Sequence, residues 1–156
     1  RSKQNGILRG AYHFFHPDLD AQGQAANFLA VVLALPKGDI PPVLDVEIDG
    51  GKSAADICQG VQQWLDVVGN ALGRTPMLYT MASFWNAKTG PSLAFGKYPL
   101  WVAHYTGKPA PVLPTGWTDY AIWQYSESGV MPGITGQVDL NRFNGTMDDL
   151  RSLAGS

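Results

Sequence analysis

The chain has 156 residues, about the size of one domain, and its hydrophobic content of 45% is enough for a folded core. It has no run of the ~18 consecutive apolar residues that a membrane span requires, so disordered and membrane-spanning classes are excluded. Eleven basic residues stand against thirteen acidic ones, a net charge of −2 without a basic stripe, and we therefore expect neither a nucleic-acid nor a membrane partner.

Two helices are predicted in the first half of the chain. From Ala25, apolar residues recur at helical spacing: Phe28, Leu29, Val32 and Leu33. A stronger stripe follows Ser53, a favourable N-cap, and ends before Gly73; it consists of Ile57, Val61, Trp64, Leu65, Val68 and Leu72. The opening segment 4–6 is typical of the carboxyl end of a further helix.

Six short runs rich in aromatic and aliphatic residues predict β-strands: Arg9–Phe15, Pro42–Glu47, Pro76–Met81, Tyr98–Tyr105, Tyr120–Ser126 and Gln137–Phe143. The first three begin about 33 residues apart, which is typical of parallel strands joined by crossover helices. The later runs lie closer together, and the proline-rich connection Gly107–Trp117 cannot hold a helix. We therefore expect an α/β fold, a TIM-like β/α barrel of parallel strands with a helix-poor C-terminal part. It is short by about two strands, because a full barrel needs at least ~200 residues.

Two carboxylates follow each other at the end of the second predicted strand. Strand alternation places Asp45 and Glu47 on the same face as Val43. Burying such a pair costs several kcal/mol, so stability alone would favour aliphatic residues there. A rise of ~6.7 Å over two residues leaves the carboxyl groups ~5–9 Å apart, which fits both retaining and inverting glycosidases.

Glu47 has the features of a general acid. Burial and the neighbouring charge of Asp45 favour its neutral form, which a general acid needs near neutral pH. The alternative is a solvated loop after the strand, in which neither carboxylate has a chemical role.

Aromatic and amide side chains recur near the ends of the other predicted strands: Tyr12, Phe14, Tyr79, Trp101, Tyr105, Trp123 and Gln124. Such groups stack on sugar rings and bind hydroxyl and N-acetyl groups, although each of them is also a common core residue. Asp139 lies between apolar neighbours and is either a buried hydrogen-bonding group or a third acidic site residue. His13 and His16 would point to opposite faces, so we expect no metal site and a packed or hydrogen-bonded His13.

Six ordered segments resemble the family 25 glycoside hydrolase lysozymes: GAYHFF (10–15), LDVE (44–47), LYT (78–80), LWVAHY (100–105), IWQYS (122–126) and VDLNRF (138–143). The resemblance implies a β/α barrel whose last strands lose their helices. It also implies retaining hydrolysis of the β-1,4 bond between N-acetylmuramic acid and N-acetylglucosamine in bacterial cell-wall peptidoglycan. No cofactor or metal is implied, and the activity would be extracellular or at the bacterial cell wall.

The resemblance also assigns roles to residues. Glu47 matches the general acid/base, and Asp139 matches a further acidic site residue. Asp45 matches the second carboxylate, which stabilises the oxocarbenium-like transition state or orients the substrate's N-acetyl group. Groove residues that hold the sugars are matched by Tyr12, Tyr79, Trp101, Tyr105, Trp123 and Gln124.

One departure concerns the beginning of the chain. Family members open with a strand that carries an Asp-Val-Ser-like motif, followed by a helix and a second strand, and nothing equivalent precedes Arg1. We therefore expect residues 1–156 to form a single, N-terminally incomplete catalytic domain whose open barrel edges favour self-association. The alternative function is a catalytically impaired remnant that binds cell-wall glycan.

Overall fold

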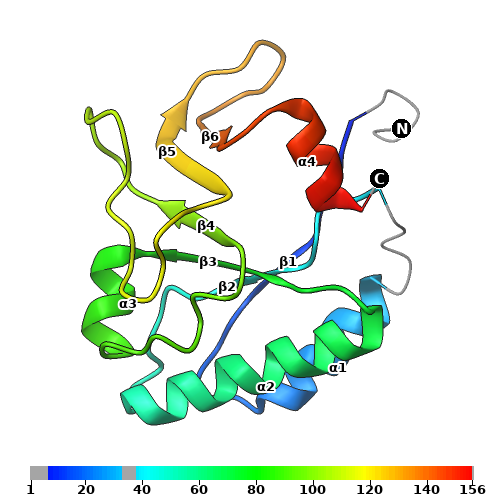
Figure 1. Cartoon of the computed structure of the whole chain (residues 1–156), viewed down its shortest axis with the longest axis vertical. Helices are drawn as coiled ribbons and strands as arrows, with labels where there is room; N and C mark the ends of the chain where they lie inside the picture. The colour runs from blue at the N-terminus through cyan, green and yellow to red at the C-terminus, as the bar shows by residue number, and fades with distance from the viewer. Residues whose placement is uncertain (1–6, 33–37, 156) are drawn as a thin grey trace.

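The computed structural model describes residues 7–32 and 38–155, which form one six-stranded sheet flanked by helices (Figure 1). The strands lie side by side in chain order: β1 (Tyr12–Phe14), β2 (Val43–Asp45), β3 (Met77–Met81), β4 (Leu100–Ala103), β5 (Ile122–Gly129) and β6 (Val138–Phe143). Each of the six predicted runs therefore overlaps a strand, and β5 extends beyond its predicted end at Ser126.

The direction of the last strand differs from the expected barrel of parallel strands. Strands β1 to β5 are parallel, whereas β6 runs antiparallel to β5. Only residues 130–137 connect β5 to β6. A parallel connection needs a crossover of a dozen or more residues, so this short segment can only turn back as a hairpin.

Two long helices, α1 (Ala21–Val32) and α2 (Ala54–Leu72), pack against each other on one side of the sheet (Figure 1). The prediction for α2 is confirmed: the Ser53 Oγ accepts the N–H of Asp56, and Gly73 ends the helix at φ 60°. Helix α1 begins earlier than its apolar pattern indicated. Leu33 and segment 4–6, two parts of the helix predictions, lie outside the described residues.

The sequence analysis missed two shorter helices. Helix α3 (Ala82–Lys88) begins directly after β3, and α4 (Met147–Ala154) follows the last strand. Thr146 and Asp149 form a capping box at the start of α4, a signature that the sequence contains. The connection Gly107–Trp117 holds no helix, as its prolines predicted.

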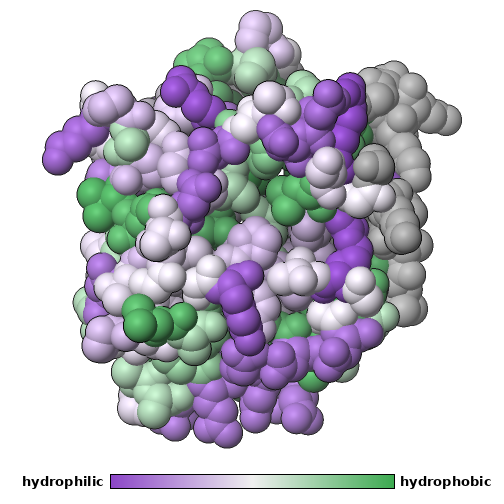
Figure 2. All heavy atoms as spheres, viewed as in Figure 1, coloured by the Kyte–Doolittle hydropathy of each residue, from purple (hydrophilic) through white to green (hydrophobic). Residues whose placement is uncertain are grey.

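The main hydrophobic core lies between the sheet and helices α1 and α2. On this outer face of the sheet, Leu44, Val46, Leu78 and Val102 are fully buried, together with Trp64 of α2. Hydrophilic side chains gather over α2 at the lower edge of Figure 2. The opposite, inner face carries a smaller apolar cluster around Val43, Met77 and Ile122.

The sheet is open at both sides within the described part of the chain. Strand β1 pairs only with β2, and β6 pairs only with β5. Residues 7–32 and 38–155 therefore form a curled mixed α/β sheet rather than a closed TIM-like barrel. Self-association through these edges stays a prediction. No described helix is both long and apolar enough to cross a membrane.

Candidate active site

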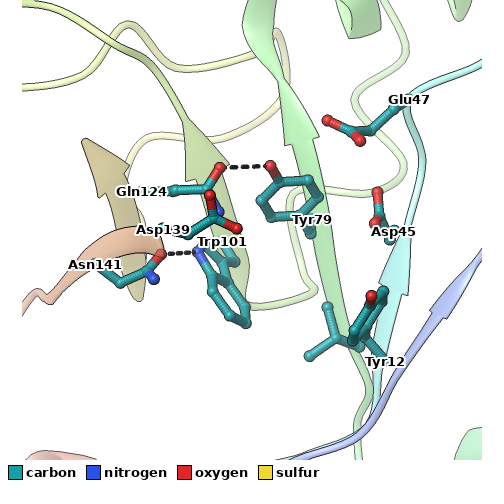
Figure 3. A pocket seen from close by; sticks show the side chains of 9 residues that line it. Tyr12, Asp45, Glu47, Tyr79, Trp101, Gln124, Asp139 and Asn141 are labelled. Atoms are coloured by element: carbon teal, nitrogen blue, oxygen red, sulfur yellow. Dashed lines mark hydrogen bonds between the residues drawn. The ribbon is translucent and has the colours of Figure 1, made fainter. Parts of the chain in front are cut away.

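A cleft of about 240 Å³ opens on the inner face of the sheet (Figure 3). Every strand contributes to its lining, which comprises Tyr12, Val43, Asp45, Glu47, Tyr79, Trp101, Gln124, Asp139 and Asn141. In Figure 3, Asp45, Glu47 and Tyr12 stand across the opening from Asp139, Asn141 and Trp101. The sheet thus brings together residues as far apart in the chain as Tyr12 and Asn141.

Backbone and side-chain bonds to β3 fix the position of the two carboxylates. Val46, the residue between Asp45 and Glu47, donates its N–H to the Tyr79 carbonyl at 2.9 Å. Its own carbonyl accepts the Thr80 hydroxyl at 2.8 Å. Because Val46 is anchored in this way, Asp45 and Glu47 both face the cleft. The alternation predicted from the sequence is confirmed, and the alternative of a solvated loop is wrong for Asp45, which is buried.

Burial and, to a smaller extent, the nearby charge of Glu47 together raise the pKa of Asp45 to about 7. Its side chain is only 8% exposed, and Oδ1 has no hydrogen-bond partner among the described residues. Burial of an unpartnered carboxylate disfavours the charged form, so Asp45 holds a proton at a pH where an exposed aspartate has lost it.

The pKa of Glu47 is also raised, and burial is the main cause. The Tyr79 hydroxyl opposes this effect, whereas the charges of Asp139 and Glu127 add to it. The predicted shift of Glu47 therefore has the expected direction, but its charge contribution comes from Asp139 and Glu127 rather than from Asp45.

Two tyrosine hydroxyls converge on one amide. Tyr79 and Tyr105 each donate to the Gln124 Oε1 at 2.7 Å. Because Oε1 accepts both hydroxyl protons, the amide nitrogen of the buried Gln124 keeps its hydrogens for another acceptor. Burial raises the pKa of both tyrosines, which keeps them as neutral donors.

The opposite wall of the cleft joins β4 to β6. Trp101 donates its Nε1–H to the Asn141 Oδ1 at 2.9 Å. Its ring meets the Tyr79 ring edge to face at 5.6 Å. The aromatic surface of the cleft is therefore held from both sides.

Asp139 lies on β6 with an exposed side chain and lines the cleft. This placement excludes the buried structural role that the sequence had left open.

The sequence analysis missed Asn141, which shares the face of Asp139 by strand alternation, and Glu127, which acts on the pKa of Glu47. Glu127 is the only other glutamate of the chain, and that rarity was the available signal.

Three residues predicted for the groove are absent from the cleft lining: Phe14, Trp123 and Tyr105, although Tyr105 donates its hydroxyl to Gln124 in the cleft. Trp123 is 4% exposed, belongs to the main core on the other face and donates its Nε1–H to the His104 carbonyl at 2.8 Å. Phe14 is absent from the cleft lining and contacts the His16 ring at 5.4 Å. Trp123 takes the core role because it alternates with Gln124, which faces the cleft.

No group of histidine, cysteine or acidic side chains within residues 7–32 and 38–155 is suited to hold a metal ion. His13 stacks on Trp64 at 5.9 Å and hydrogen-bonds to the Gln24 Oε1 at 3.0 Å, so its predicted packed role is confirmed. Asp49, the next acid after Glu47, pairs with Lys88 at 2.6 Å.

Paired carboxylates with aromatic and amide groups in an open cleft, on an α/β sheet, define a glycosidase type of site. Residues 1–134 match the family model described as Glycosyl hydrolases family 25, and the chain belongs to this family.

Relatives of known sequence include YegX of Escherichia coli K12, 42% identical over 152 residues, and Lysozyme M1 of Streptomyces globisporus, 35% identical over 164 residues. Each alignment covers 97% of this chain and 54% of the relative, so the chain spans about half the length of these two proteins.

Solved structures show the same fold. The bacterial lysozyme from Streptomyces coelicolor superposes with a TM-score of 0.90 at 33% identity, covering 99% of this chain and 75% of that one. The family GH25 lysozyme from Aspergillus fumigatus gives a TM-score of 0.87 at 32% identity, with coverages of 99% and 77%.

Proposed function

We propose that this chain is a peptidoglycan hydrolase that cleaves the β-1,4 bond between N-acetylmuramic acid and N-acetylglucosamine. The observation that carries the proposal is the pair of carboxylates, Asp45 and Glu47, held side by side at the edge of an open cleft with raised pKa values. Relatives named lysozyme and N,O-diacetylmuramidase support this substrate class. Residues 1–156 would act as one catalytic domain, extracellular or at the bacterial cell wall.

Glu47 acts as the general acid and then as the base. Burial favours its protonated form, and it lies at the rim of the cleft, where a glycosidic oxygen can reach it. Its proton passes to that oxygen as the bond between the oxygen and the anomeric carbon breaks. The resulting carboxylate later takes a proton from the water that attacks the same carbon.

Asp45 orients the N-acetyl group of the substrate. Asp45 lines the cleft and its carboxyl group has no hydrogen-bond partner in the described chain, so the carboxyl group can accept an acetamido N–H from the substrate. The acetamido carbonyl oxygen then attacks the anomeric carbon and forms a cyclic oxazolinium ion, while Asp45 accepts the N–H hydrogen bond. Two successive displacements at one carbon retain its configuration.

The remaining cleft residues bind the sugars. The Tyr79 and Trp101 rings offer apolar faces for sugar C–H groups, and the free amide hydrogens of Gln124 suit a hydroxyl or carbonyl oxygen. Asp139 raises the pKa of Glu47 across the opening, which keeps the acid protonated.

The test is the release of reducing ends from purified peptidoglycan. We expect the chain to release them and Glu47→Gln to lower the rate by about 10³-fold, because the amide cannot donate the proton. Glu127→Gln, the same change at a residue outside the cleft lining, should keep most of the activity at its pH optimum. Binding of the glycan without release by the unchanged chain would contradict the proposal and favour the alternative function, a glycan-binding remnant.

A further inference from the structure

A second pocket, of about 470 Å³, lies directly beyond the cleft at the carboxyl ends of β3 and β4. Met81 and Ala103, which line it, are neighbours in the sheet register. Each lies two positions after a cleft residue, Tyr79 or Trp101, and therefore on the same inner face. The second pocket thus continues the surface that carries the proposed active site.

One tyrosine joins the two spaces. Tyr105 lines the second pocket, whereas its hydroxyl donates to Gln124 in the cleft at 2.7 Å. Tyr79 donates to the same oxygen from within the cleft. The boundary between pocket and cleft therefore consists of three hydrogen-bonded side chains. A ligand in the pocket and a ligand in the cleft would lie on opposite sides of this boundary.

Hydrogen-bond donors remain unused in the second pocket. The Asn86 Oδ1 accepts the Thr115 N–H at 2.7 Å, which leaves the amide hydrogens of Asn86 as donors. The His104 Nδ1 accepts the Val112 N–H at 3.0 Å, so the neutral ring carries its proton on Nε2. Neither donor group has a hydrogen-bond partner within the described part of the chain.

Charge and polarity separate the pocket from the cleft. No acidic residue lines the pocket, and Met81, Ala82 and Val112 give it apolar walls. The cleft carries the carboxylates of Asp45 and Glu47, with Asp139 on its opposite wall. A ligand group with methyl groups and carbonyl oxygens therefore suits the pocket, and a negative charge on that group meets no acidic side chain there.

We propose that this pocket binds the short peptide that the substrate carries on its muramic acid sugar. Such peptides consist of alanine-type residues and residues with free carboxylates. Their methyl groups would pack on Met81 and Val112, and their carbonyl oxygens would accept from Asn86 and His104. The inference rests on the proposed function, since the substrate it names is peptidoglycan.

The test compares peptidoglycan with its peptides intact and the same glycan after an amidase has removed them. Val112→Asp places a negative charge in the pocket, and it keeps the backbone N–H that His104 accepts. We expect it to lower kcat/KM about tenfold on the peptide-bearing glycan and to leave the peptide-free glycan unaffected. Val112→Asn, whose side chain has the shape of aspartate without its charge, should lose less on the peptide-bearing glycan than Val112→Asp, because it removes the apolar contact but adds no repulsion.

A matched control is Val31→Asp, the same change at an exposed valine on α1, far along the chain from the pocket. This control should leave kcat/KM unchanged on the peptide-bearing and on the peptide-free glycan. An equal loss on both substrates in Val112→Asp would overturn the proposal, because the pocket would then bind sugar rather than peptide. No loss on either substrate would overturn it as well.

A binding measurement separates this inference from the proposed function. Glu47→Gln is titrated with a soluble disaccharide that carries its peptide and with the same disaccharide without it. We expect tighter binding of the peptide-bearing form, and loss of that preference when Val112→Asp is added. Equal binding of both forms would overturn the peptide proposal even if the hydrolase activity is found. Absence of activity with the preference intact would instead count against the hydrolase alone.

Discussion

The two faces of the sheet are built from the same strands but have different roles: the outer face packs in the core, and the inner face lines the cleft. On the outer face, Leu44, Leu78 and Val102 are fully buried against the helix layer. One position away on the inner face, Asp45 and Tyr79 line the cleft. Because successive side chains of a strand point to opposite faces, a short segment supplies both core and site.

The inner face itself changes along the strands. Near its beginning, β2 contributes Val43 to an apolar cluster, as β3 contributes Met77. Two residues later, Asp45 and Tyr79 take the same face. The polar groups thus gather at the carboxyl ends of the parallel strands, where the packing of the core gives way to an open cleft.

The largest effect on stability is expected when a buried side chain of the outer face is removed. Leu78→Ala removes a fully buried side chain and should lower the free energy of unfolding by about 3 kcal/mol, because lost burial and the resulting cavity add. Urea unfolding measures this loss of stability. The folded variant should keep its kcat, since the cleft residues are unchanged, and a kcat that falls while stability holds would contradict the division of roles.

A substitution on the inner face should instead raise the free energy of unfolding. The pKa of Asp45 is 3.8 in an ordinary setting and about 7 in the folded protein, so the folded state binds its proton more tightly, and stability falls as pH rises between these values. Asp45→Asn should remove this loss and make the variant more stable above pH 7 by on the order of 2 kcal/mol, with the difference fading near pH 4. Urea unfolding of the variant and the unchanged chain at both pH values checks this expectation. A stability difference that is the same at both pH values would contradict the burial of a charge at Asp45. Activity should fall in the same variant.

Tyr79→Phe sharpens the comparison with its neighbour Leu78. The change removes the hydroxyl that donates to Gln124 and lowers the pKa of Glu47. We expect kcat to fall about tenfold with a loss of stability of about 1 kcal/mol or less. The alkaline limb of kcat/KM should move to higher pH, because Glu47 holds its proton longer.

Tyr105→Phe is the control for that pH profile. It removes the other donor to Gln124 and leaves in place the Tyr79 hydroxyl, which lowers the pKa of Glu47. A shift of equal size in both variants would mean that the amide, rather than the Tyr79 hydroxyl, sets the pKa of Glu47.

The smallest effect is expected at Glu127. Its charge raises the pKa of Glu47, so Glu127→Gln should move the alkaline limb of kcat/KM to lower pH, opposite to Tyr79→Phe. Because Glu127 is exposed, high salt should screen its charge and remove the difference between the variant and the unchanged chain. A shift that persists at high salt would contradict a through-solvent charge effect.

The sequence by itself determined which segments form strands and where the carboxylates lie on them. The alternation of side chains along a strand and the N-cap and glycine signals of α2 are local. Local rules correctly predicted that Asp45 and Glu47 share a face and that α2 is a helix. Segments without a strong local pattern were missed: α3 begins directly after a strand, and α4 has a capping box but few apolar residues.

Only the tertiary structure decided which side chains meet. Trp123 and Gln124 are adjacent in the sequence, and only the packing of β5 assigns one to the core and the other to the cleft. The direction of β6 likewise decides that Asp139 stands across from Glu47, since a hairpin brings its residues back past β5. The pKa of Asp45 depends on how many neighbours exclude water from it, a property of the assembled sheet that no single segment contains.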